Sequence, residues 1–150
     1  MVLYPYAKEF GAPQHRDVRG EGEWEVPVRN GTYRFTVTGP NGFRREFAGT
    51  GQGAAAAVRM GTRIDAGRRE FHLTVTNHSR TDLTFTLRPL AYTDSAPRTV
   101  KVKAGSIRTV AHSAADAHGW YDLGLTAGED MSFRRRLMGH VENGKESVTG

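Results

Sequence analysis

The feature that most constrains this chain is an alternation of apolar and polar residues with a period of two. Apolar side chains occupy every second position in several short segments, and threonine or charged residues fill most of the positions between them. In a β-strand, such a pattern places the apolar side chains on one face. Each segment is therefore predicted to be a strand with one buried and one exposed face. The clearest examples are residues 33–38, 71–76, 83–88, 100–103 and 121–126.

Turn-forming residues separate these segments at short intervals, as in Asn30-Gly31, Gly39-Pro40-Asn41-Gly42 and Ala104-Gly105. No window of a dozen residues carries a convincing helical stripe, and we interpret the alanine-rich segment 53–60 as the entry to a strand. Many short strands at this spacing are typical of a sandwich or barrel. The prediction is an all-β fold, an antiparallel β-sandwich of about nine or ten short strands.

Composition narrows the class of protein. A chain of 150 residues buries enough surface to hold a core without metal or disulfides, and the absence of cysteine excludes disulfide scaffolds, thiolate metal sites and cysteine nucleophiles. No apolar run reaches the length of a membrane helix, so no transmembrane segment is expected. The start, MVLYPYAKEF, lacks the basic and apolar regions of a signal peptide. We therefore expect a globular domain.

The net charge of the chain is +5, and several of its arginines occur in short clusters. No nucleic-acid-binding motif accompanies them, so we expect no nucleic-acid partner. They either keep exposed strand faces soluble or contact an anionic surface such as phospholipid headgroups. Because alternate strand residues share a face, Arg134 and Arg136 should point one way and Arg135 the other. Trp120 and Tyr121 must also differ, one of them facing outward. The predicted lipid-contact residues are Arg44, Arg45, Arg134, Arg136 and Trp120.

An internal echo joins the two ends of the chain. Residues 31–49 resemble residues 119–139, with Tyr33 matching Tyr121 and Arg44-Arg45 matching Arg134-Arg135. Each copy is predicted to be a strand–turn–strand hairpin. Residues 1–50 are then the tail of a first repeat, packed with the rest, and residues 51–150 are a complete second domain. We expect the first hairpin to join the sheets of the second repeat, because an isolated hairpin is marginal in water.

The histidines offer one constellation with possible chemistry, His112, Asp116 and His118 in the sequence HSAADAH. It contains a base and a carboxylate to orient it, or ligands for zinc. The spacing fits no known metal motif, and a polar loop is the simpler interpretation. Nucleophile-elbow and phosphate-loop motifs are absent from the sequence. We predict no catalytic residue, no metal and no cofactor.

Several blocks resemble a known family in the order expected for it. They are GPNGFRREFAG, LTVTNHSRTDLTFTLRPLAY, KVKAGSIRTVAHSAADAHGWYDL and FRRRLMGHVENGKESV. The chain looks like the C-terminal domain of bacterial phospholipase C, of the phosphocholine-preferring, non-haemolytic type. The resemblance implies a secreted parent hydrolase that cleaves phosphatidylcholine or sphingomyelin, and a large catalytic domain that carries its nucleophile and metals. No block here matches that catalytic domain, so the resemblance implies that this chain is a fragment of a longer one.

Three functions remain open at this point. The first is a non-catalytic accessory domain of a phospholipase C, acting in lipid catabolism, which stabilises the catalytic domain or brings it to a lipid surface. The second is a free-standing β-sandwich that binds sugar, peptide or protein, because a fold does not fix a function. The third is a small hydrolase that uses His112, Asp116 and His118. The partners expected under the first are the parent's catalytic domain and a phospholipid surface.

Overall fold

The computed structural model describes residues 1–144 and 148 and confirms the all-β prediction. The end of the predicted second domain, residues 145–147 and 149–150, lies outside the described residues. The strands are β1 (Val2–Pro5), β2 (Gln14–His15), β3 (Thr32–Thr38), β4 (Arg44–Thr50), β5 (Val58–Asp65), β6 (Glu70–Asn77), β7 (Leu83–Ala91), β8 (Arg98–Val102), β9 (Ile107–Ser113), β10 (Trp120–Ala127) and β11 (Arg134–His140).

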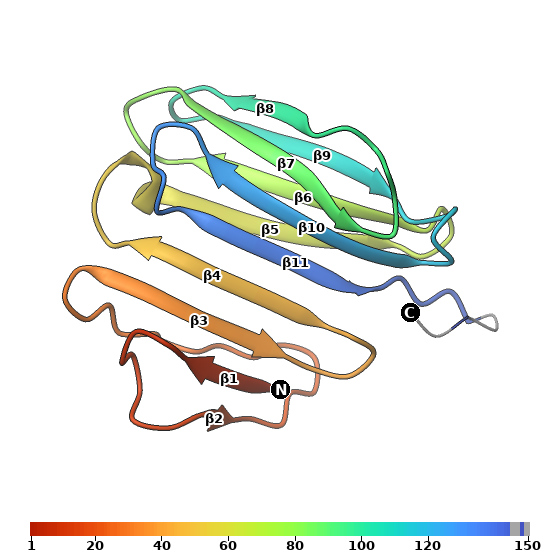
Figure 1. Ribbon diagram of the computed structural model, residues 1–150, viewed down its shortest axis with the longest axis horizontal. Coiled ribbons are helices and arrows are strands. Elements are labelled where there is room, and N and C mark those ends of the chain that lie inside the picture. Colours follow the sequence, from red (N-terminus) through yellow and green to blue (C-terminus); the bar gives the residue numbers. More distant parts are fainter. Residues whose placement is uncertain (145–147, 149–150) are drawn as a thin grey trace.

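The strands form two antiparallel sheets. The larger has eight strands in the order β2-β1-β3-β4-β11-β10-β7-β8, and the smaller has the order β5-β6-β9. Figure 1 shows the large sheet in front and the small sheet behind β11, β10, β7 and β8 only. We call the side of the large sheet that faces the small one its inner face, and the opposite side its outer face. No helix of the described residues is long and apolar enough to cross a membrane.

The core lies between the small sheet and the second-repeat half of the large sheet. The alternating apolar residues of segments 71–76, 83–88, 100–103 and 121–126 point into it, which confirms the predicted phases of those strands, whereas those of segment 33–38 lie outside this core. Phe71 of β6 stacks on Tyr121 of β10 with ring centroids 4.4 Å apart, and Phe85 of β7 meets Phe133 edge-on at 5.6 Å. Burial of these apolar side chains is the main stabilising contribution to the sandwich.

One expected strand entry is wrong in part. The alanines form a single turn of 3₁₀ helix, η1 (Ala54–Ala57), and extended backbone begins only at Val58. Alanine has a low strand propensity, and here Ala55 is buried in the core from the 3₁₀ turn. The turn carries the chain from the large sheet to the small one.

The first hairpin joins the large sheet, as predicted. Its turn has positive φ at Asn41 and Gly42, and the amide of Phe43 donates to the carbonyl of Pro40, which makes a type I′ turn. Strand β4 then pairs with β11, with Glu46 opposite Arg136. The two hairpins thus lie side by side and form one continuous surface.

The large sheet has an approximate twofold arrangement about the line between β4 and β11. Strands β4, β3, β1 and β2 extend from that line on one side, and β11, β10, β7 and β8 extend on the other. The matching hairpins of the sequence, β3–β4 and β10–β11, occupy equivalent places. The first repeat lacks a counterpart of the small sheet among the described residues, so only the second repeat forms a two-layer sandwich.

Candidate functional site

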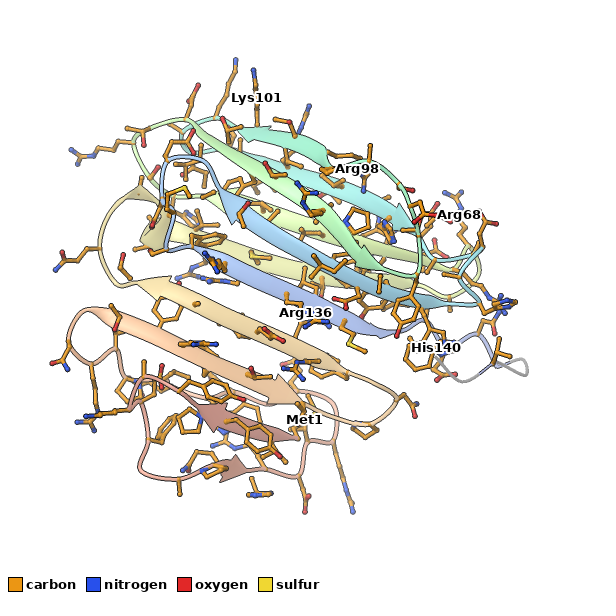
Figure 2. All side chains as sticks on the ribbon, in the orientation of Figure 1. Met1, Arg68, Arg98, Lys101, Arg136 and His140 are labelled. Carbon is orange, nitrogen blue, oxygen red and sulfur yellow. The ribbon has the colours of Figure 1, made fainter. Side chains whose placement is uncertain are left out.

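The arginines singled out from the sequence meet where β4 and β11 pair. Opposite residues of paired strands share a face, so the register places Arg44 and Glu46 of β4 on the same side as Arg134 and Arg136 of β11. This is the outer face of the large sheet, where Figure 2 labels Arg136. We call the pairing of β4 with β11 the seam.

Two of the outer-face arginines are already ion-paired. Arg136 donates two hydrogen bonds to the carboxylate of Asp122, at 2.8 and 2.6 Å, and one to Glu46 at 3.4 Å. Asp122 is only 3% exposed. The hydrogen bonds from Arg136 to the Asp122 carboxylate raise the pKa of Arg136 above its ordinary value. Arg44 donates to Glu46 at 2.6 Å, so a chain of four alternating charges crosses the seam.

Arg45 is buried, which removes it from the predicted lipid contacts. Its guanidinium donates to the Tyr121 hydroxyl at 2.9 Å and to the carbonyl of Met138 at 2.7 Å. It also lies 4.4 Å from the centroid of the Phe43 ring. The alternation rule that separates Arg134 from Arg135 also turns Arg45 inward, since Arg44 faces outward.

Arg135 repeats this arrangement from the other side of the seam. It donates to the Tyr33 hydroxyl at 2.6 Å and to the carbonyl of Ala48 at 2.7 Å, and it stacks 4.1 Å from the Phe133 ring. Burial lowers its pKa, although Tyr33 opposes the shift. Each repeat therefore contributes one arginine that donates a hydrogen bond to a tyrosine of the other repeat. We call these two contacts the arginine exchange.

Two glycines make room for the tyrosines. A Cβ on Gly49 would lie 2.5 Å from the Tyr33 hydroxyl, and one on Gly139 would lie 2.8 Å from that of Tyr121. Each glycine is the strand partner of its tyrosine. Tyrosine, arginine and glycine recur at matching positions of residues 31–49 and 119–139, so the sequence repeat contained the pattern of these contacts. The arginine exchange itself was not predicted.

Trp120 is half-buried at the end of the outer face, and Tyr121 points into the core. The ring centroid of Trp120 lies 4.8 Å from that of His140 and 5.9 Å from that of Tyr92. A Cβ on Gly42 would lie 2.7 Å from the Trp120 ring. The indole N–H donates to the carbonyl of Val148 at 2.8 Å. Trp120 thus covers the turn of the first hairpin.

The histidine constellation is not assembled as a set of three. His112 and Asp116 line a cavity of about 270 Å³ between the sheets, whereas His118 does not line it. The backbone carbonyl of His118 accepts a hydrogen bond from His140 instead. Burial and the charge of Arg98 lower the pKa of His112. The cavity therefore holds the predicted base and carboxylate, His112 and Asp116, but not His118, the third of the possible zinc ligands.

A different cluster brings possible metal ligands together. Asp65, Glu70 and His72 have ligand atoms within 4.8 Å of one another on the exposed face of the small sheet. His72 is hydrogen-bonded to Glu70 at 3.1 Å, and Asp65 accepts the amide of Arg68 at 3.0 Å. Arg63 lies opposite His72 and opposes the approach of a cation. These contacts account for the cluster without a metal.

Comparison with known proteins gives a consistent family. The model of the family described as "Bacterial phospholipase C, C-terminal domain" matches residues 2–50 and 55–140. The hemolytic phospholipase C of Pseudomonas aeruginosa is 34% identical over 98% of the chain, and the non-hemolytic phospholipase C of Burkholderia pseudomallei is 32% identical over 85%. The non-hemolytic enzyme of P. aeruginosa is 34% identical over 80%. The chain spans about a fifth of the length of these relatives, 18 to 20%.

Proposed function

This chain belongs to the family of bacterial phospholipase C C-terminal domains, and from that premise we propose that it is a non-catalytic accessory domain of a phospholipase C. The observation that carries the proposal is the family match, because it spans both repeats and names a C-terminal domain. The parent is then a secreted hydrolase of lipid catabolism, and its catalytic domain is the partner of this domain.

The site geometry supports a non-catalytic role. The inward-facing arginines of the seam, Arg45 and Arg135, donate to carbonyls and tyrosine hydroxyls, and two outer-face arginines are held in ion pairs. Catalysis of ester cleavage needs a nucleophile, a base and stabilisation of developing charge within reach of one another. The three predicted residues do not form one set, because His118 does not line the cavity that His112 and Asp116 share. The seam has the contacts of a rigid support.

A lipid-binding role is the competing form of the same proposal. It draws on the exposed Arg134 and on the half-buried Arg44, Arg136 and Trp120. Each basic residue near an anionic membrane contributes about 1 kcal/mol. Because Arg44 and Arg136 share carboxylates, their attraction to a distant anionic surface is reduced. We therefore favour support of the catalytic domain over lipid binding.

The test is an assay of the isolated chain on phosphatidylcholine, with Zn²⁺ and Ca²⁺ added in separate reactions. We expect no release of phosphocholine above the buffer rate, while the intact hemolytic phospholipase C of P. aeruginosa serves as the positive control. Metal-dependent turnover that His118→Ala abolishes would instead establish a hydrolase. A matched control, His15→Ala, replaces an exposed histidine outside the constellation.

A further inference from the structure

We propose that the outer face of the large sheet docks onto an acidic, convex protein surface. The inference rests on the proposed function, under which that surface belongs to the catalytic domain of the parent enzyme. Three observations carry it: the shape of the face, its charge and the apolar side chains that surround it.

The outer face is hollowed rather than flat. A groove of about 1010 Å³ crosses the large sheet and is lined by residues of both repeats, including Arg34 and Arg44 from the first and Leu90 and Arg136 from the second. Sheets twist, and a wide sheet without a covering layer becomes concave along one diagonal. A flat lipid bilayer touches only the rims of such a groove, whereas a convex protein surface reaches its floor.

The charge of the groove selects an acidic partner. The outward-facing ionic side chains of β3, β4, β7, β10 and β11 are five arginines and two carboxylates. Asp122 and Glu46 are engaged by Arg136 and Arg44. Arg134, which lines the groove, and Arg88, which lies on the same face outside the lining, are exposed and make no ion pair within the part of the chain that the structure describes. Arg34 is exposed and is held over the Tyr6 ring at 5.7 Å.

Exposed apolar side chains flank these arginines. Tyr6 is 56% exposed, Leu90 49% and Met131 81%, and all three line the groove. Tyr4 lies on the same face, opposite Thr36 of β3. Tyrosine, methionine and arginine are enriched at protein interfaces, where they supply contact area and bidentate hydrogen bonds to carboxylates. The combination of free arginines and exposed apolar groups on one face, in and beside the groove, is therefore that of a protein-binding surface.

The experiment is arginine footprinting with phenylglyoxal, read by mass spectrometry. It compares the isolated chain with a fusion in which this chain replaces the matching segment of the hemolytic phospholipase C of P. aeruginosa. We expect Arg34, Arg88 and Arg134 to react about tenfold more slowly in the fusion, because the core of an interface excludes solvent. Arg59 and Arg63, exposed on the far side of the small sheet, should react equally in both proteins.

Charge reversal tests whether the groove itself is responsible. Arg88→Glu combined with Arg134→Glu should restore the reactivity of Arg34 in the fusion to that of the isolated chain. The matched control, Arg59→Glu with Arg63→Glu, makes the same change in net charge and should leave Arg34 protected. Equal loss of protection in the two double variants would show an effect of net charge alone and would overturn the proposal.

A membrane arm separates the two kinds of partner. The isolated chain is footprinted with vesicles of phosphatidylcholine that contain about 30% anionic lipid, a composition with a strongly negative surface. We expect little change at Arg34, Arg88 and Arg134. Protection by vesicles but not in the fusion would assign the face to lipid, and protection in neither would leave it as bare surface. Either result overturns the proposal.

Phosphocholine release keeps this test distinct from that of the proposed function. An active fusion in which Arg34, Arg88 and Arg134 stay reactive contradicts docking alone, whereas hydrolysis by the isolated chain contradicts the accessory role. A fusion that does not fold is replaced by the intact P. aeruginosa enzyme. Its arginines in the matching segment are then compared with those of the same segment produced alone, and the same two outcomes apply.

Discussion

Arginine side chains make most of the polar side-chain contacts across the seam, and they do so in two environments. On the outer face, Arg136 pairs with the nearly buried Asp122, where one charge compensates the other. On the inner face, Arg45 and Arg135 are surrounded by carbonyls, hydroxyls and aromatic rings. A planar guanidinium with five donors suits such a site, because it can satisfy several acceptors at once while its faces stack on rings.

Removing Arg45 should therefore destabilise the fold. Arg45→Met removes the donor to the Tyr121 hydroxyl and the side-chain hydrogen bond to the Met138 carbonyl, and we expect a loss of about 2–4 kcal/mol in the free energy of unfolding. Urea denaturation measures it. Arg134→Met, the exposed neighbour of Arg135, should change stability by less than about 0.5 kcal/mol. A double-mutant cycle with Tyr121→Phe should give a coupling of about 1 kcal/mol, and zero coupling would contradict the exchange.

The paired glycines give a second prediction. Gly139→Ala places a methyl group against the Tyr121 hydroxyl, so the ring must move and release Arg45. Overpacking of this kind costs about 1–3 kcal/mol, seen as a lower thermal midpoint. Gly61→Ala is the control, because Gly61 also lies in a strand and its nearest neighbour would be 4.0 Å away. It should be neutral or stabilising by up to about 1 kcal/mol. Equal losses would mean that the tyrosine contact is unimportant.

At the scale of elements, the side chain of Glu9 links the N-terminal residues 6–9 to β3 through hydrogen bonds. Its fully buried carboxylate accepts the amides of Tyr6 and Ala7, at 3.2 and 2.8 Å, and that of Arg34. Burial alone would raise the pKa of Glu9, but these amides outweigh it and lower the pKa. A carboxyl with a lowered folded pKa stabilises above its unfolded pKa, and that stability is lost as the pH falls through the folded pKa.

Acid should consequently loosen this segment first. Between about pH 5 and pH 3, hydrogen exchange at Tyr6, Ala7 and Arg34 should accelerate relative to the core strand β6. Exchange rates are corrected for the intrinsic effect of pH. Glu9→Gln should make exchange at the three amides fast already at neutral pH and remove most of the acid response. Glu21→Gln, at an exposed position, should leave the response intact. An unchanged response in Glu9→Gln would assign it to another group.

The elements show what alternation can and cannot predict. Strands such as β6 and β10 were found because one face of each is buried in the core. Strands β1 and β9 were missed, and their patterns explain why. Val2–Pro5 is too short to show a period, and Ile107 is 65% exposed on an edge strand, where no buried face imposes one. The sandwich was predictable, but the total number of strands was not.

The functional surface was predictable to a similar degree. The repeat suggested that the outward arginines of the two hairpins could share one face if the hairpins lay side by side. The sheet register places Arg44 opposite Met138 and Arg134 opposite Ala48, so the two arginines share the outer face but lie four residues apart along the paired strands. Alternation along a strand requires Arg45 to face inward if Arg44 faces outward. The predicted lipid contacts nevertheless included both residues. The ion pair between Arg136 and Asp122 depends on the register of β10 with β11, which spacing alone does not supply.

At the scale of the whole molecule, the arginine exchange joins two repeats into one sheet. Each hairpin completes the other, since Arg45 reaches Tyr121 and Arg135 reaches Tyr33 across the same strand pairing. An approximate twofold relation doubles each contact, so a loss on one side leaves its counterpart in place. The consequence is that residues 1–50 should be held to residues 51–150 by contacts across the seam and not by the covalent link alone.

Cutting the link tests this directly. A protease site placed in the exposed segment Gly51–Gly53 should yield two fragments that still elute together in size-exclusion chromatography, since main-chain hydrogen bonds of β4 with β11 and the arginine exchange remain. The nicked protein should melt at a lower temperature, because cleavage increases the entropy of the unfolded chains. Arg45→Met combined with Arg135→Met should let the fragments separate, whereas Arg59→Met with Arg63→Met should not. Separation of the nicked wild-type fragments, with residues 51–150 still folded, would show that the second repeat is an independent domain and that the seam contributes little to its stability.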